Sequence, residues 1–275
     1  MSMSYFDDIQ ESAKFIREKF PQLPDLAIVL GTGMGALEGR LKPIREISYR
    51  LIPSFVPTTV ESHVGKMVLA SWAGREVLLL SGRLHYYEGY SLQEVTFPIR
   101  VLAALGIRNI WFTNASGSVN PAFGAGDLVF IEDHINFHPE NPLRGIYDAR
   151  LGPRFPDMSQ VYDREWLEKA SGVCSELEMP FRSGVYFGLQ GPSLETAAEY
   201  RMIRTLGGDI VGMSTVPEVI VAQQSGMRIM AASVVSNHVH GYAPAEKTTL
   251  ESVLAVISQS SAKLFDVYEK MLGII

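Results

Sequence analysis

Apolar side chains near the N-terminus recur at spacings of three and four residues, the period of a helix that buries one face. They are Phe6, Ile9, Ala13, Ile16 and Phe20. Pro21 follows directly, and proline cannot continue a helix because its ring blocks the backbone hydrogen bond. The pattern therefore predicts an amphipathic helix that ends before Pro21 and packs on the protein core.

Short apolar runs, several of them continuous, follow this helix and are typical of buried strands. They are Leu26–Leu30, Met67–Ala70, Val77–Leu80, Asn109–Thr113, Leu128–Ile131, Val185–Leu189, Ile210–Gly212 and Arg228–Ser236. Helical patterns stand between many of them, at Leu92–Leu105, Glu165–Leu177, Thr196–Leu206 and Val219–Ser225. Strands that alternate with helices indicate an α/β fold.

The C-terminal part predicts one long helix, because apolar positions from Leu250 to Met271 share a face. Thr248 and Glu251 have the spacing of a capping box at its start. The stretch Asn136–Tyr162 differs, with four prolines and no sustained periodicity, and predicts a long ordered loop or a subunit contact. Strand and helix signals resume on both sides of it, so we expect a single domain over residues 1–275.

Composition excludes several classes of function. The 275 residues contain 24 Lys and Arg against 30 Asp and Glu, without the dense basic cluster that a nucleic-acid surface requires. No apolar run approaches the roughly 18 residues of a membrane helix, and the N-terminus lacks the basic start and apolar block of a secretory signal. The single cysteine, Cys174, cannot form an internal disulfide. We therefore expect a cytoplasmic protein that binds neither nucleic acid nor membrane.

The segment Gly31-Thr32-Gly33-Met34-Gly35-Ala36 follows the first strand and formally matches a dinucleotide-binding fingerprint. This match makes an NAD-dependent oxidoreductase one alternative. However, Gly39 and Pro43 interrupt the next dozen residues and leave no room for the crossover helix of such a unit. What remains is a glycine turn whose backbone approaches an anion, with the Thr32 hydroxyl as a further donor. The structural alternative is an ordinary tight turn after the strand.

Three further segments follow predicted strands and carry groups that bind anions. Arg83 and His85 alternate, so in an extended segment their side chains share one face. Thr113–Ser118 is predicted as a loop of small residues with accessible backbone N–H groups. Val211–Glu218 runs into a helix N-terminus that favours negative charge, with Ser214 as N-cap or ligand donor. Each segment has an ordinary structural interpretation, but together they indicate a phosphate site.

The histidines give no sign of a metal site, because none of the six has a metal-ligand spacing such as H-E-x-x-H. His134 and His138 are four residues apart, but proline-rich sequence follows them, and we interpret the pair as structural. We predict no metal.

Seven segments of the chain together resemble the trimeric purine nucleoside phosphorylases. They are Gly31–Gly35, Gly82–Gly89, Thr113–Pro121, Asp133–Asn136, Arg154–Asp163, Gly191–Glu199 and Gly212–Ala222. They span most of the chain in the expected order, and Gly212-Met213-Ser214-Thr215-Val216-Pro217-Glu218-Val219 is highly specific. The resemblance implies one α/β domain with a mixed central sheet flanked by helices.

The resemblance also implies phosphorolysis of 6-oxopurine nucleosides such as inosine and guanosine, with inorganic phosphate as co-substrate and no cofactor. The implied phosphate ligands are Thr32, His63, Arg83, His85, Ser214 and the backbone of Ala115. The implied ribose and base contacts are Tyr87, Met213, Leu250, Leu194, Glu195 and Asn237, with Phe155 donated across a subunit interface. The residues implied in catalysis are Asn237, His85, Glu195 and His63. The interface residue implies a homotrimer.

Two positions depart from the family pattern. Leu194 stands where an aromatic residue is usual, and Leu250 stands where a histidine toward the ribose 5′-hydroxyl is common. These departures leave the nucleoside preference open. A 5′-methylthio-nucleoside phosphorylase of the same superfamily and a nucleoside-binding module without turnover therefore remain as alternatives.

Overall fold

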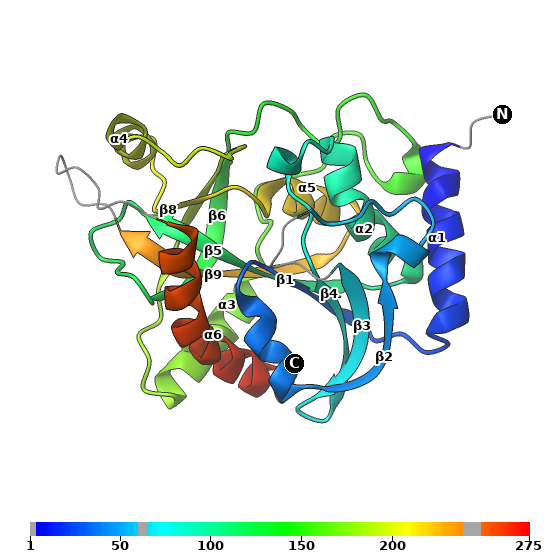
Figure 1. Cartoon of the computed structure of the whole chain (residues 1–275), viewed down its shortest axis with the longest axis horizontal. Helices are drawn as coiled ribbons and strands as arrows, with labels where there is room; N and C mark the ends of the chain where they lie inside the picture. Colours follow the sequence, from blue (N-terminus) through cyan, green and yellow to red (C-terminus); the bar gives the residue numbers. More distant parts are fainter. Residues whose placement is uncertain (1–3, 60–64, 239–248) are drawn as a thin grey trace.

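The computed structural model describes residues 4–59, 65–238 and 249–275 (Figure 1). In this part of the chain nine strands form one mixed sheet with the order β2-β3-β4-β1-β5-β8-β7-β6-β9. The strands are β1 (Leu26–Leu30), β2 (Lys42–Ser48), β3 (Lys66–Trp72), β4 (Arg75–Ser81), β5 (Asn109–Ser118), β6 (Leu128–Asn136), β7 (Ser183–Gly188), β8 (Ile210–Gly212) and β9 (Arg228–His238). Strand β5 also pairs with β9, so the strands β5, β8, β7, β6 and β9 form a closed ring of paired strands.

The central strand β1 lies between β4 and β5, parallel to both. All five of its residues are buried, as expected for a strand that is covered on both faces. Its alternate side chains enter different cores: Ala27 and Val29 join one, and Leu26, Ile28 and Leu30 join the other. The α/β class and the mixed sheet expected from the sequence are thereby confirmed.

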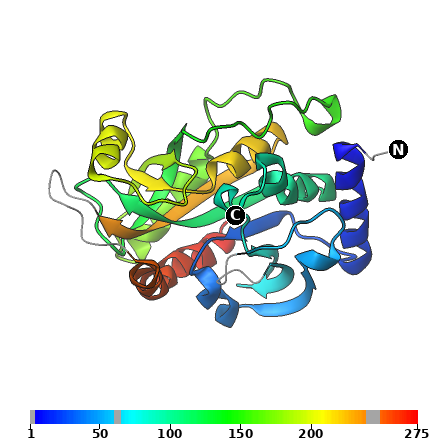
Figure 2. The same ribbon diagram turned by 45° about the horizontal axis from the view of Figure 1, so that its top comes forward.

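The helices cover the two faces of this sheet. They are α1 (Tyr5–Lys19), α2 (Leu92–Leu105), α3 (Arg164–Glu176), α4 (Ala197–Thr205), α5 (Val216–Gln224) and α6 (Leu250–Leu272). The first core takes its helical residues from α1, α2 and α5, and the second from α3, α6 and the 3-10 helix η1 (Met34–Arg40). Figure 2 shows α5 and α6 on opposite sides of the central strands. No helix in the described ranges is long and apolar enough to cross a membrane.

The helix ends follow local capping chemistry. The Ser4 side chain accepts a hydrogen bond from the Asp7 backbone at the start of α1, and Ser91 and Glu94 form a capping box at α2. Two predicted boundaries are wrong. Helix α5 begins at Val216 rather than Val219, because Pro217 occupies the first turn, where its missing N–H costs nothing.

The capping box predicted for the last helix is also misplaced. Thr249 is the N-cap of α6 and pairs with Ser252, one residue later than the predicted Thr248 and Glu251. Thr248 itself lies outside the described residues.

The glycine-rich turn after β1 leads into η1 and then β2, which lies at the sheet edge away from β1. The crossover unit of a dinucleotide-binding fold is therefore not formed at this turn, in agreement with the sequence argument. Strand β2 itself escaped prediction, because five of its seven residues are exposed and carry no apolar run.

The segment Thr113–Ser118 is not a loop, because it continues strand β5. Its backbone pairs with β9 on one side and, at Gly117 and Ser118, with β8 on the other. The expected loop is confirmed between β6 and α3, where residues 137–163 contain only the short helix η4 (Ala149–Leu151) and an isolated bridge from Tyr162 to Ile229.

Candidate functional site

The turn after β1, the loop after β4 and the ends of β5, β8 and β9 enclose a cavity of about 450 Å³, which the start of α6 also lines. Ten of the residues singled out in the sequence line it: Thr32, Arg83, His85, Tyr87, Ala115, Leu194, Glu195, Met213, Ser214 and Asn237. They come from segments up to about 200 residues apart. The sheet thus assembles in one place most of the anion-binding and base-binding candidates.

A buried ion pair forms the floor at one end of the cavity. Arg83 Nε lies 2.8 Å from Glu218 Oε2, and their side chains are 1% and 5% exposed. Arg83 Nη1 donates to the Thr113 carbonyl at 2.7 Å and lies 3.5 Å from Ser214 Oγ. Burial raises the pKa of Glu218, and the Arg83 guanidinium opposes that shift. The arginine is thus held rigidly with its charge beside the Ser214 hydroxyl.

His85 lies at the same end, and Glu88 orients its ring. Glu88 Oε1 accepts from the His85 backbone at 2.7 Å and lies 3.1 Å from Nδ1. Burial lowers the pKa of His85, although Glu88 opposes the shift. Burial would raise the pKa of Glu88, but hydrogen bonds from His85 and Thr59 outweigh it and hold that pKa at about 2. The result is a neutral imidazole next to a fixed carboxylate, and its ring stacks on Tyr87.

The turn before α5 has a constrained backbone. Thr215, rather than the predicted Ser214, is the N-cap, and it adopts φ +67°, a left-handed conformation that a β-branched residue rarely takes. Asn114 Nδ2 donates to the Thr215 hydroxyl at 2.9 Å and fixes it in place. Gly212 approaches Tyr186 so closely that a Cβ would lie 2.2 Å from the phenol oxygen. Such strain typically persists where a site requires it.

The other end of the cavity carries a carboxylate and an amide. Burial raises the pKa of Glu195, a hydrogen bond from Tyr200 opposes the shift, and the Glu199 carboxylate adds to it. The Ser236 hydroxyl donates to Asn237 Oδ1 at 2.8 Å. Tyr200, which is 6% exposed, lines the same cavity. A fixed acceptor and a fixed donor therefore face the cavity, and Leu194, 52% exposed, adds an apolar wall.

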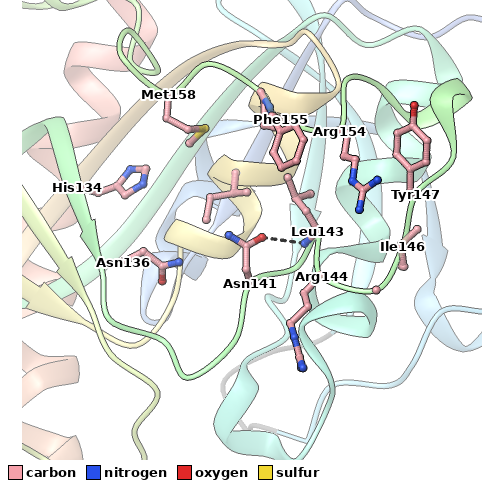
Figure 3. A pocket seen from close by; sticks show the side chains of 13 residues that line it. His134, Asn136, Asn141, Leu143, Arg144, Ile146, Tyr147, Arg154, Phe155 and Met158 are labelled. Atoms are coloured by element: carbon pink, nitrogen blue, oxygen red, sulfur yellow. Dashed lines mark hydrogen bonds between the residues drawn. The ribbon is translucent and has the colours of Figure 1, made fainter.

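Phe155 does not line this cavity. It is 85% exposed and lies on a separate cleft of about 700 Å³, formed largely by the loop between β6 and α3. Figure 3 shows the Arg154 guanidinium between the Phe155 and Tyr147 rings, at 5.6 and 5.3 Å from their centroids. His63 and the Leu250 side chain lie outside the described residues, although Thr249 and Val253 bring the start of α6 to the cavity.

Several residues of this site were missed in the sequence. Glu88 had a signal, since it stands three residues after His85. No separate signal in the sequence pointed to the other two. Glu218 lies in the first turn of a helix, and Tyr200 lies at an apolar position of a helix. In the described ranges no group of three or more His, Cys, Asp or Glu residues could hold a metal ion. His134 Nδ1 instead lies 3.0 Å from the Tyr162 hydroxyl.

Comparison with known proteins identifies the family of the chain. The family model of the phosphorylase superfamily matches residues 25–273. Purine nucleoside phosphorylase 1 of Bacillus subtilis is 47% identical over 235 residues, which cover 86% of this chain and 87% of that protein. Isoform 2 of the Schistosoma mansoni enzyme, solved with cytosine and ribose-1-phosphate, is 38% identical, with a TM-score of 0.92 and coverage of 98% of this chain and 97% of that one. A Schistosoma enzyme solved with hypoxanthine is 33% identical, with a TM-score of 0.92 and coverage of 100% and 99%. The chain therefore belongs to the phosphorylase superfamily and, within it, to the purine nucleoside phosphorylases.

Proposed function

We propose that this pentosyltransferase cleaves 6-oxopurine nucleosides with inorganic phosphate, giving the free purine and ribose 1-phosphate without a cofactor. The observation that carries the proposal is the polarity of the one cavity. Arg83 bonds to Thr113 of β5 and lies near Ser214, whereas Asn237 pairs with Gly117, four residues or about 13 Å further along the same strand. His85 and Glu195 line the same cavity. A phosphate and a purine base bound at these ends would place a ribose between them, beside Tyr87 and Met213.

Phosphate is the ligand that the first end suits. The Arg83 guanidinium supplies charge, and the Thr32 and Ser214 hydroxyls and the Ala115 backbone supply short polar contacts. His85, neutral because it is buried, can accept a proton from dihydrogen phosphate, which becomes hydrogen phosphate, while Glu88 stabilises the imidazolium that forms. The nucleophile would thus be bound in its more highly charged form.

The chemical step needs no side-chain nucleophile. A phosphate oxygen forms a bond to C1′ as the bond from C1′ to N9 breaks, and the electron pair moves into the purine. The phosphate charge stabilises the cationic ribose of the transition state. Asn237 donates to N7 or the 6-oxo group as negative charge grows there, so its hydrogen bond strengthens in the transition state.

Selectivity for 6-oxopurines follows from Glu195. As a carboxylate it accepts the N1–H of hypoxanthine or guanine. Adenine presents a lone pair at N1, and a buried acceptor left without a donor costs about 1–3 kcal/mol. One related structure is solved with hypoxanthine and another with adenosine, so they support purine binding, and the argument for selectivity rests on Glu195.

A trimer belongs to the same proposal. Phe155 is 85% exposed at the rim of a cleft. Its aromatic ring stays in contact with water there unless another chain covers it. We place it against the ribose of a neighbouring subunit. His63 lies outside the described residues and keeps the phosphate and sugar role that the resemblance implies. The start of α6, which lines the cavity through Thr249 and Val253, is placed toward the ribose 5′ position. Because the sequence has leucine at position 250, 5′-methylthio-nucleosides are the second candidate substrates.

One assay tests the central proposal. Inosine is incubated with and without phosphate, and hypoxanthine release is followed, with 5′-methylthioinosine and adenosine in parallel. We expect release from inosine only with phosphate. Release without phosphate would indicate a hydrolase, no release would leave a binding module, and faster cleavage of the methylthio substrate would favour the second candidate.

The role of Asn237 is tested by Asn237→Ala. We expect turnover on inosine to fall much more than phosphate affinity does, because the lost donor acts on the leaving base. Equal losses in both would contradict the assignment.

A further inference from the structure

The last turn of α5 holds the loop segment that carries Phe155. Gln224 Nε2 donates to the Pro153 carbonyl at 2.8 Å, and Gln223 Nε2 donates to the Asp157 carbonyl, also at 2.8 Å. Pro153 and Asp157 stand two residues before and two residues after Phe155. Two consecutive glutamines therefore hold the backbone on both sides of this aromatic residue.

Gln224 is itself held by Arg100 of α2. Arg100 Nη2 donates to Gln224 Oε1, and Arg100 Nη1 donates to the Leu151 carbonyl at 3.2 Å. Both side chains belong to buried residues, Arg100 at 4% and Gln224 at 7% exposure. An arginine only donates, so its guanidinium faces the amide oxygen of Gln224, and the NH2 group of that amide then points to Pro153. The partners of Gln224 thus determine its orientation.

The backbone of the same loop passes directly against α5 at Gly152. This residue has φ +124°, and a Cβ there would lie 2.1 Å from the Gln224 carbonyl oxygen. Only glycine permits so close an approach. Every residue of α5 except Gln223 is buried, so the helix gives the segment a firmly packed base.

We propose that Gln224 is a positioning residue for Phe155: together with Gln223 it holds the backbone of residues 153–157 where the Phe155 ring can reach the ribose of a neighbouring subunit. The inference rests on the proposed function, which places Phe155 at that ribose. The ring is 85% exposed in its own chain, so its position depends on the backbone that carries it. Because the folded chain orders this backbone in advance, substrate binding does not bear the entropy cost of ordering it.

The test is Gln224→Glu, which keeps the shape of the side chain and its acceptor for Arg100 but removes the donor to Pro153. The guanidinium beside the new carboxylate keeps it ionised, so it cannot donate. We expect KM for inosine to rise about threefold and KM for phosphate to stay within about twofold, as the loss of one hydrogen bond outside the phosphate site implies. Trypsin should cleave after Arg154 about threefold faster, because cleavage requires the local backbone to leave its folded position.

The matched control is Gln93→Glu. Gln93 Nε2 also donates to a carbonyl of the same loop, that of Arg144, at 3.3 Å. That carbonyl lies eleven residues before Phe155. The same substitution there should leave both KM for inosine and cleavage after Arg154 unchanged.

A double variant shows whether the effect on inosine passes through Phe155. In the Phe155→Ala background, Gln224→Glu should raise KM for inosine no further, because the ring that it positions is gone. A merely structural role of Gln224 would instead give the same rise in KM with and without the ring, and that result would overturn the proposal.

The outcomes separate this proposal from the proposed function. A wild-type enzyme that does not cleave inosine with phosphate overturns the function, and the trypsin assay still decides whether Gln224 holds the segment. An active wild type whose Gln224→Glu variant keeps its KM for inosine, or resists trypsin as wild type does, overturns the positioning role alone. Faster cleavage after Arg154, a raised KM for inosine, an unchanged KM for phosphate and no further loss in the Phe155→Ala background support it.

Discussion

Replacing Glu218 with glutamine removes the negative member of the buried ion pair while keeping its shape. Arg83 then keeps its positive charge in a site where its side chain is 1% exposed, and it still donates to the Thr113 carbonyl. Removal of one partner from a buried ion pair typically costs 3–5 kcal/mol. Glutamine retains an oxygen that can accept from the guanidinium, so we expect about 3 kcal/mol.

This loss depends on phosphate. A bound phosphate supplies the negative charge that the variant lacks, so its binding should restore much of the lost stability. A chain of this size changes Tm by about 2–4 °C for each kcal/mol, so Glu218→Gln should melt roughly 6–12 °C below wild type without phosphate. With saturating phosphate the difference should shrink by half or more, because the variant binds phosphate more tightly than wild type and is therefore stabilised more at the same phosphate concentration.

The assay is thermal and urea denaturation of both proteins across a phosphate titration. Glu165→Gln is the control, because Glu165 pairs with Arg228 and Lys169 at the surface, where water screens the charge. It should melt with wild type at every phosphate concentration. A Glu218→Gln protein as stable as wild type without phosphate, or one that phosphate stabilises less than wild type, would refute the reasoning.

Three further predictions use the same structure. Burial lowers the pKa of His138 to about 4. Between about pH 6.5 and 4 the unfolded chain therefore binds a proton that the folded chain does not. The free energy of unfolding of wild type falls over this range as the pH falls, by up to about 3 kcal/mol. His138→Leu should lose less over that range in urea denaturation, and a parallel loss would contradict the burial argument. Phe155→Ala should raise KM for inosine at least fivefold, because the ring, 85% exposed within its own chain, is proposed to contact the ribose of a neighbouring subunit; unchanged kinetics would remove Phe155 from the site. Ser214→Ala should raise KM for phosphate about tenfold, the value of one hydrogen bond to a charged ligand, and an unchanged phosphate KM would place the anion elsewhere.

The sequence was most informative where one local signal decides the structure. Apolar spacing placed α1, and continuous apolar runs placed the buried strands, because burial on both faces leaves no polar position. Arg83 and His85 were found together because alternation in an extended segment puts both on one face. These features depend on neighbours within a few residues.

What escaped prediction depends on partners that are distant in the chain. Strand β2 is mostly exposed and is held by pairing with β3, which its own residues do not encode. The backbone of Thr113–Ser118 is extended because β8 and β9 bind it from both sides. Glu218 acts through Arg83, which is 135 positions away, and no spacing rule connects the two residues.

Strand β5 pairs with β1, β8 and β9, and its second half also forms a wall of the cavity. The amides that β5 pairs with its neighbours at the centre of the sheet are exposed to solvent only when those strands separate, which requires global unfolding. Hydrogen exchange at Trp111 and Phe112, which are fully buried and pair with β9, should report the full free energy of unfolding. Heat inactivation that begins at this wall should then coincide with the melting of the whole sheet. The enzyme would be either fully folded or inactive, without a folded intermediate in which this strand alone has separated.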